Sequence, residues 1–317
     1  MKLDSIKRIG IAGAGTMGSG IALIFAKKGY KVTVMDLSIT LLEDSRKLVD
    51  IFNQTLLAEE LMTSDEEERV MSNIEYSLDK SAFKDCDLII EAIVEKLEVK
   101  QSFWKEVKSI AKKDAYLATN TSGLSINSIS EDIVDKTRFV GMHFWNPPHI
   151  VPLVELIKGD ETSDETVEVL KSLMKRIDKE PVIVQKDTPG FIGNRLQFAA
   201  FREALHILKE GVGTVEDIDK AMRFGPGFRY PVLGPLETAD LGGLDTFYYI
   251  SAYLFKNLSD SKEAPEILKE KIDSGNLGVK TKEGFYEYFD GQDEEVIKRR
   301  DSMFIKMLKL NNSAEKK

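Results

Sequence analysis

The chain has 317 residues, of which 42% are hydrophobic and 31% are charged, and its formal net charge is −9. Its length favours two domains, and its composition excludes collagen-like, low-complexity and largely disordered proteins. The acidic balance argues against nucleic-acid binding, and no apolar run reaches the roughly 18 residues that a membrane helix needs. The single cysteine, Cys86, allows neither an intrachain disulfide nor a cysteine cage for zinc. Without a signal-peptide pattern, we expect a cytoplasmic protein with no metal site, no membrane contact and no nucleic-acid partner.

The first part of the chain alternates short apolar runs with amphipathic stretches. The predicted strands are 8–12, 31–35, 88–93, 116–119, 139–142, 151–157 and 182–184. Helical spacing between most of them predicts βα units on a mainly parallel sheet. We therefore expect an α/β protein whose first domain, residues 1–186, is a Rossmann-like doubly wound sheet that binds the cofactor.

The pattern changes after Asp187, where Pro189 and Gly190 mark a hinge between two parts of the chain. Beyond the hinge, apolar residues recur with helical spacing over 191–209, 215–224, 239–258 and 264–272. The second domain, residues 187–317, is therefore expected to be mainly α-helical. Its large apolar side chains, such as Phe247 and Tyr248, exceed what a small domain covers alone, which favours a homodimer formed through this half.

A glycine-rich motif follows the first predicted strand. The residues that fit the G-x-G-x-x-G pattern are Gly13, Ala14, Gly15, Thr16, Met17 and Gly18. The motif opens a predicted helix, so the backbone can approach a pyrophosphate that the helix N-terminus stabilises. The next predicted strand ends in Asp36, near the offset of roughly 20 residues at which a carboxylate binds the ribose hydroxyls. Asp36 would repel a 2′-phosphate, and residues 37–40 contain no lysine or arginine, so the predicted cofactor is NAD rather than NADP.

Polar side chains with catalytic chemistry lie between residues 119 and 195. Ser122 follows one predicted strand and His143 follows another, at the strand ends where open α/β sheets bind their ligands. Glu155 is embedded in an apolar strand and needs a partner, and orienting a histidine is one such role. Asn194 begins the first helix of the second part, so this helix end can face the cleft.

Eight segments carry a resemblance to a known family. They are GAGTMG, EAIVEKLEVK, ATNTSGLSI, GMHFWNPP, PLVELI, DTPGFIGNRL, GPLETADLGGLD and LGVKTKEGFYEY. Over nearly its whole length the sequence resembles the NAD-dependent 3-hydroxyacyl-CoA dehydrogenases. The resemblance implies that His143 is the general acid/base and that Glu155 orients it, while Ser122 and Asn194 hydrogen-bond the substrate oxygen or the histidine. It also implies an oxidoreductase of fatty acid metabolism that forms a homodimer, with Glu95, Lys100, Ser122, Asn146 and Lys280 near the cofactor.

Two departures from the family pattern concern the substrate. In acyl-CoA members a lysine-rich stretch contacts the CoA phosphates, whereas residues 48–68 here carry seven acids and no Lys or Arg, which leaves Arg46 and Lys47 as candidates. The second departure is a long link over 225–235 that contains Arg229 and looks more like relatives acting on small hydroxy acids. Arg229 is either a clamp for a substrate carboxylate or an ordinary surface ion pair.

Three functions therefore compete. The motifs favour a dehydrogenase of a short-chain L-3-hydroxyacyl-CoA. The alternative is an NAD-dependent dehydrogenase of a small free hydroxy acid or alcohol, resembling the gulonate, carnitine or pyridine-alcohol enzymes. A non-catalytic NAD-binding protein is the third, and the intact set of Ser122, His143, Glu155 and Asn194 argues against it.

Overall fold

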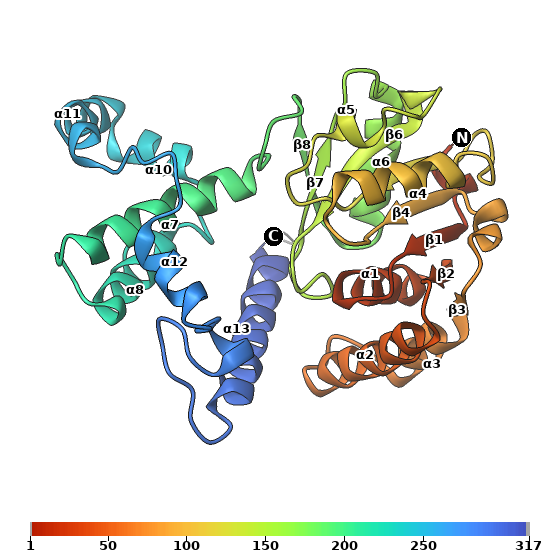
Figure 1. Cartoon of the computed structure of the whole chain (residues 1–317), viewed down its shortest axis with the longest axis horizontal. Helices are drawn as coiled ribbons and strands as arrows, with labels where there is room; N and C mark the ends of the chain where they lie inside the picture. The colour runs from red at the N-terminus through yellow and green to blue at the C-terminus, as the bar shows by residue number, and fades with distance from the viewer. Residues whose placement is uncertain (1, 315–317) are drawn as a thin grey trace. The chain divides into compact units, whose positions relative to one another are not determined.

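The computed structural model describes residues 2–314, with side chains up to residue 310 (Figure 1). The chain divides into two compact units. Unit 1 contains the described residues up to Asn194 together with those from Arg299 onward, and unit 2 is Arg195–Lys298. No helix within the described range is long and apolar enough to cross a membrane.

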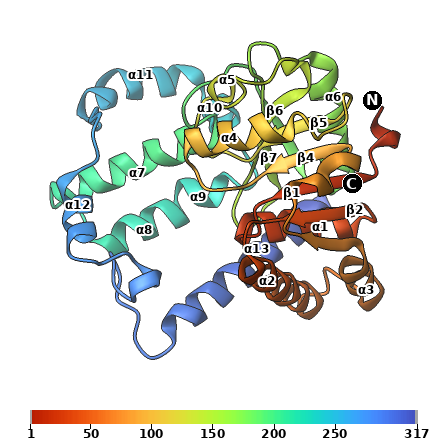
Figure 2. The ribbon, with the colours of Figure 1, turned by 45° about the vertical axis from the view of Figure 1, so that its right-hand side comes forward.

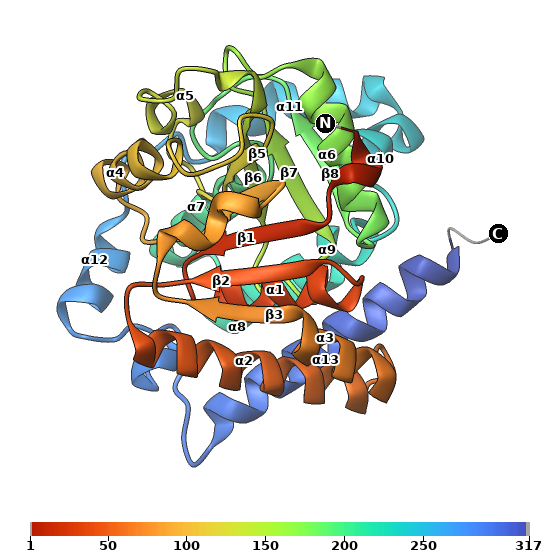
Figure 3. The same ribbon diagram turned by 90° about the vertical axis from the view of Figure 1, so that its right-hand side faces the viewer.

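Unit 1 is built on one eight-stranded sheet with the strand order β3-β2-β1-β4-β5-β6-β7-β8. Every neighbouring pair is parallel except β6 and β7, which are antiparallel. Figure 3 shows β1, β2 and β3 side by side at one edge. The strands are β1 (Arg8–Ala12), β2 (Lys31–Met35), β3 (Ile74–Ser77), β4 (Leu88–Glu91), β5 (Tyr116–Thr119), β6 (Phe139–Phe144), β7 (Leu153–Ile157) and β8 (Glu180–Val184). The predicted doubly wound, mainly parallel sheet is confirmed, with β3 as a strand that the sequence pattern did not reveal.

Helices cover both faces of this sheet because alternate strand residues point to opposite sides. Ile90 of β4 packs in one apolar cluster with α1 and α6, while its neighbour Ile89 packs in a second cluster with α4 and α5. The elements of unit 1 outside the sheet are α1 (Thr16–Lys27), α2 (Ile39–Ala58), α3 (Ser64–Asn73), α4 (Leu97–Val107), α5 (Ile126–Ile129), α6 (Asp164–Arg176) and the 3-10 turns η1 (Leu3–Ser5), η2 (Lys80–Asp85) and η3 (Lys136–Arg138). The C-terminal part of α13 (Gln292–Ala314) also belongs to unit 1, with Ile305 fully buried.

Unit 2 is helical, as predicted, and Figure 2 shows α7 and α8 side by side within it. Its elements are α7 (Gly193–Lys209), α8 (Val215–Phe224), α9 (Pro226–Arg229), α10 (Pro235–Gly242), α11 (Leu244–Leu254), η4 (Phe255–Asn257), α12 (Glu266–Asp273) and η5 (Val279–Thr281). The helix expected over 239–258 is divided, because Gly243 has φ +89° and ends α10. A left-handed φ is accessible to glycine and interrupts a right-handed helix.

The compact units differ from the predicted domains at two places. The sequence pattern placed the boundary at 186/187, whereas unit 2 begins at Arg195. Residues from Arg299 onward were assigned to the second domain and lie instead with unit 1. The chain therefore passes from unit 1 into unit 2 and returns, which a single predicted boundary could not describe.

Candidate active site

The glycine loop between β1 and α1 has the shape that a phosphate requires. Gly13 has φ +103°, and a Cβ built there would collide with the carbonyl oxygen of Ala92. A Cβ on Gly18 would likewise collide with the Gly13 carbonyl oxygen, so these glycines keep the turn tight. Gly15 has open space where its Cβ would be. It is the N-cap of α1, and because it has no side chain, the first amides of the helix have no side-chain cap. Those amides remain free to donate to an anion, which fits the pyrophosphate of a dinucleotide.

Asp36 lies at the end of β2 beside this loop. Its carboxylate accepts the amides of Ala14 at 2.8 Å and Leu37 at 2.7 Å. Each carboxylate oxygen keeps further lone pairs for ribose hydroxyls. The residue also lines a cavity of about 650 Å³, which is within the usual range for a cofactor site.

Residues of α4 and of the loop before it complete the wall of that cavity, and none of them was predicted from the sequence as a site residue. They include Ile93, Val94, Glu98, Val99, Ser102 and Phe103. Apolar side chains dominate this set, and they suit the flat faces of an adenine base. Because these residues are separated from Asp36 by about sixty positions, no local sequence pattern connects them to the glycine loop.

A second network holds Glu95 at the carboxyl end of the sheet. Its carboxylate accepts the Thr121 hydroxyl at 2.5 Å and the Ser122 amide at 2.7 Å, and it forms an ion pair with Lys100 at 3.1 Å. Burial would raise the pKa of Glu95, but these hydrogen bonds and the lysine charge together lower it. Lys100 is itself buried and pairs with Glu91, so its ammonium group is already neutralised inside unit 1. Glu95 therefore links Lys100 and Ser122 in one network, and the contact with a cofactor that the resemblance implies for these residues stays a prediction.

The sheet register brings His143 and Glu155 together. The two residues are direct partners in the antiparallel pair β6–β7, so their side chains lie on the same face of the sheet. The Nδ1 atom of His143 lies 2.9 Å from Oε2 of Glu155, and both side chains are buried. Since a carboxylate only accepts hydrogen bonds, Nδ1 carries the proton and Nε2 is left as a proton acceptor.

Three further donors fix Glu155. Its Oε1 accepts the backbone amides of Ile192 and Gly193, each at 2.9 Å, and its Oε2 also accepts Nε1 of Trp145 at 3.3 Å. Burial acts to raise the pKa of Glu155, but the four donors, led by His143, lower it below its ordinary value. The carboxylate is therefore ionised at neutral pH and can stabilise a protonated imidazole.

Trp145, Ile192 and Gly193 were not recognised from the sequence as parts of this site. Trp145 stands two positions after His143, the spacing that places side chains on one face of a strand, so this contact had a local signal. The amides of residues 192 and 193 had none, because backbone donors leave no trace in the residue types. The rings of Trp145 and Phe191 lie 5.8 Å from the imidazole between centroids.

The remaining predicted substrate and cofactor residues of unit 1 lie at different places. Nδ2 of Asn194 donates to the carbonyl oxygen of Ser122 at 2.9 Å, so these two candidates are in contact. Asn146 is exposed and precedes a cis bond to Pro147. On α2, the Arg46 guanidinium lies over the Tyr76 ring at 4.8 Å, and the neighbouring Lys47 is paired with Asp44 at 2.9 Å.

Two predicted site residues belong to unit 2. Lys280 lies in the 3-10 turn η5, and Arg229 ends the short helix α9. Arg229 is exposed, and its guanidinium has no hydrogen bond or ion pair with the described residues, so its contact with a substrate stays a prediction.

Two family models match the chain. The 3-hydroxyacyl-CoA dehydrogenase NAD-binding domain matches residues 8–188, and the 3-hydroxyacyl-CoA dehydrogenase C-terminal domain matches residues 190–288. Among relatives, the 3-hydroxybutyryl-CoA dehydrogenase of Bradyrhizobium diazoefficiens is 38% identical over 284 residues, which cover 89% of this chain and 96% of the relative. The 5-formyl-3-hydroxy-2-methylpyridine 4-carboxylate 5-dehydrogenase of Mesorhizobium japonicum is 30% identical over 311 residues, which cover 98% and 100%.

Solved structures give the same two groups of similar proteins. A 5-formyl-3-hydroxy-2-methylpyridine 4-carboxylic acid 5-dehydrogenase, described as an NAD+-dependent dismutase, has a TM-score of 0.90 at 30% identity and covers 96% of this chain and 98% of that one. The (S)-3-hydroxybutyryl-CoA dehydrogenase of Ralstonia eutropha has a TM-score of 0.75 at 35% identity and covers 90% and 100%.

Proposed function

We propose, on the premise that the chain belongs to the NAD-dependent 3-hydroxyacyl-CoA dehydrogenase family, that it interconverts an alcohol and a carbonyl on a small carboxylate-bearing substrate. It is an NAD-dependent oxidoreductase. The observation that supports the catalytic assignment is the buried His143–Glu155 pair, whose 2.9 Å contact leaves Nε2 of the imidazole free to move a proton.

The residues divide the work as follows. NAD, when bound, supplies the hydride acceptor, and the glycine loop with Asp36 holds it. In the oxidising direction, Nε2 of His143 takes the hydroxyl proton from the substrate, and the ionised Glu155 stabilises the resulting imidazolium. Ser122 and Asn194, which contact each other, hydrogen-bond the reacting oxygen. In the reducing direction the imidazolium returns the proton to the alkoxide oxygen.

The contacts of the basic residues support a small free acid as the substrate. Arg229 presents a guanidinium with no partner among the described residues, and this planar fork matches a carboxylate. By contrast, Lys47 is already paired with Asp44. Among the acids of residues 48–68, Glu66 has a structural role, because it forms a capping box with Thr63 at the start of α3, where negative charge is favourable.

The extent of the matches points in the same direction. The family model for the second domain ends at residue 288, whereas the Mesorhizobium pyridine-carboxylate enzyme matches 98% of this chain. The second candidate substrate is a short-chain L-3-hydroxyacyl-CoA, which the sequence motifs favour and which is supported by the 38% identical Bradyrhizobium relative. In that case CoA would depend on few basic residues, with Arg46 the more available.

Steady-state NADH oxidation separates the two candidates. The purified protein is assayed with acetoacetyl-CoA and with a panel of free keto acids and aromatic aldehyde-carboxylates. For a free acid, Arg229→Lys should lower kcat/KM by roughly 10- to 100-fold, since a charged hydrogen bond contributes about 1.5–3 kcal/mol. Arg223→Lys in the same unit is the control and should have little effect. Turnover of acetoacetyl-CoA alone, with a loss in Arg46→Ala but not in Arg229→Lys, would overturn the free-acid proposal.

We also propose that the protein is a homodimer associated through unit 2. Among the described residues of unit 2, Leu205 is the one hydrophobic residue that is buried, whereas Phe228, Leu236, Tyr248 and Phe255 are each at least 70% exposed. A soluble monomer rarely exposes so much large apolar surface. Light scattering after size exclusion should give twice the mass of one chain, and a monomer mass at micromolar concentration would contradict the proposal.

A further inference from the structure

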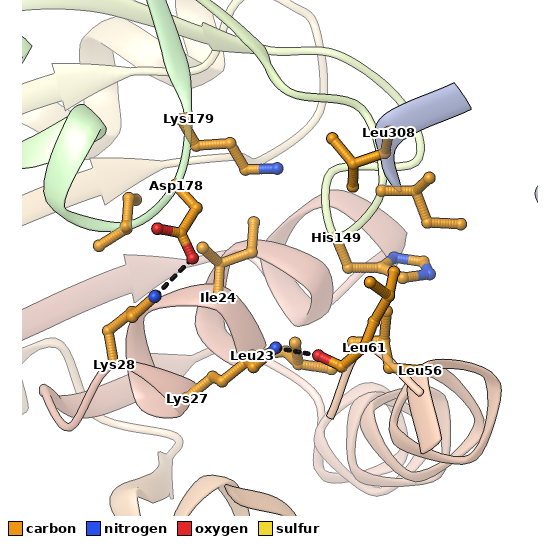
Figure 4. Close-up of a pocket in the computed structure, with 12 residues that line it drawn as sticks. Leu23, Ile24, Lys27, Lys28, Leu56, Leu61, His149, Asp178, Lys179 and Leu308 are labelled. Atoms are coloured by element: carbon orange, nitrogen blue, oxygen red, sulfur yellow. Dashed lines mark hydrogen bonds and ion pairs between the residues drawn. The ribbon is translucent and has the colours of Figure 1, made fainter. Parts of the chain in front are cut away.

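Unit 1 contains a second cavity, of about 160 Å³, whose lining residues include none of the catalytic or cofactor candidates. Its walls come from α1 and α2 with the residues that follow each, the loop that follows β6, the segment before β8, and α13. Figure 4 shows Lys179 on one side of this space and Lys27 and Lys28 on the other, with His149 and Leu308 at its far end. The cavity therefore brings together lysine side chains and apolar side chains that are far apart in the sequence.

The polar groups of Lys179 and His149 are only partly satisfied. Lys179 is 4% exposed, and its ammonium group donates to the carbonyl oxygens of Pro148 at 2.7 Å and Val151 at 2.8 Å. A lysine ammonium has three protons, so one donor remains. The Nδ1 atom of His149 is buried and has no hydrogen-bond partner within the described residues, while its ring stacks on Phe52 at 4.0 Å. Buried polar atoms in native proteins usually have a hydrogen-bond partner, so this nitrogen is available to a ligand.

The charge of the lining favours an anion. Lys27, Lys28 and Lys179 face a single acid, Asp178, which is already paired with Lys28. Lys27 donates to the Leu61 carbonyl oxygen. An incoming carboxylate would therefore meet Lys179 and His149 without a competing free acid.

The rest of the lining is apolar. Seven of the twelve lining residues are leucine or isoleucine, namely Leu23, Ile24, Leu56, Leu61, Ile150, Ile177 and Leu308. A cavity of about 150 Å³ is known to hold a molecule of about six non-hydrogen atoms such as benzene. The size and the chemistry together fit a short unbranched carboxylate such as butyrate, with its oxygens at Lys179 and His149 and its chain along the leucines.

We propose that this cavity is a binding site for a short-chain monocarboxylate, held by Lys179 and His149 and enclosed by Leu308 of α13. The site is separate from the catalytic pair, so the proposal does not depend on which substrate the enzyme oxidises.

The three histidines of the chain, His143, His149 and His206, make NMR a direct test. Burial lowers the pKa of Lys179 to about 7, so histidine-labelled full-length protein is titrated with sodium butyrate below that pH. The His149 signals should shift and saturate, while those of His206, which lies on α7, stay in place. Butan-1-ol, which lacks the charge, and inorganic phosphate, which lacks the chain, should leave His149 unchanged.

Variants then locate the binding. Leu308→Trp fills the cavity and should weaken butyrate binding at least about tenfold, and Lys179→Met should do the same by removing the charged donor, each tenfold being about 1.4 kcal/mol. Met303→Trp is the matched control, because Met303 lies on the same helix and is exposed. Leu308→Trp keeps the test decisive if Lys179→Met does not fold. Unsaturated or absent shifts at His149, an equal response to phosphate, or unchanged binding in Leu308→Trp would each overturn the proposal.

Discussion

Replacing Glu155 with glutamine tests how the carboxylate sets the chemistry of His143. One oxygen of Glu155 faces two backbone amides that can only donate, so the single glutamine oxygen must occupy that position. The glutamine NH₂ group then faces His143 and Trp145. His143 Nδ1 can bond this donor only as an acceptor, which moves the ring proton to Nε2, where the substrate proton should go.

This wrong tautomer should lower kcat by roughly 10²–10⁴-fold, the usual contribution of a general base. A second donor, Trp145 Nε1, also loses its acceptor, so the free energy of unfolding should fall by about 1–3 kcal/mol. Stopped-flow NADH oxidation measures the first effect and urea unfolding the second, and NADH binding by fluorescence should be nearly unchanged.

The Trp145→Phe background separates the two effects. Without the indole donor, Glu155→Gln should cost less stability, whereas the loss of kcat should persist because it arises at His143. A Glu155→Gln enzyme that keeps nearly native kcat would refute the tautomer argument and would move the base to another residue.

Other substitutions give further expected outcomes. Asp36→Ala should weaken NAD binding by about 1–3 kcal/mol, because the ribose hydroxyls lose their acceptor. The difference in affinity between NAD and NADP should also become smaller, because the carboxylate no longer repels the 2′-phosphate. Calorimetry measures both affinities, and a preference of the native protein for NADPH would contradict the assignment. Gly13→Ala should lower the urea midpoint, since the φ of +103° and the Ala92 carbonyl both oppose a side chain. Burial lowers the pKa of His149 from 6.5 to about 3, so the stability tied to its neutral form is complete above pH 6.5 and is lost as the pH falls toward 3. Unfolding titrations should show a flatter pH dependence for His149→Phe, and an unchanged slope would mean that the ring is not buried.

Most of the sheet could be predicted from the sequence because periodicity is a local signal. The strands that begin at Arg8, Lys31 and Tyr116 match their predicted bounds. The strand β3 was missed because Ile74–Ser77 is short, follows α3 directly and alternates weakly. Gly242 and Gly243 do mark the break in the helix expected over 239–258, and the apolar periodicity on either side concealed it.

The candidate site was predictable only in part. The glycine motif and Asp36 are near each other in sequence and carry a local pattern, and the catalytic set came from the family resemblance. Which atoms meet depends on register: His143 and Glu155 face each other because β6 and β7 are antiparallel, a reversal that the predicted parallel units did not contain. The cavity at Lys179 depends on five separate segments, so no single stretch of sequence could reveal it.

The return of the last helix to unit 1 has a consequence for synthesis on the ribosome. Chains emerge N-terminus first, and early domains usually fold before later ones are made. Here Ile305 is fully buried and Leu308 lines a cavity with Leu23 and Ile24, so the nascent sheet unit keeps an apolar patch uncovered until the segment that contains Ile305 and Leu308 has been synthesised. During that interval the patch is available to chaperones and to other nascent chains, and a premature stop shortly before Ile305 would leave it permanently exposed.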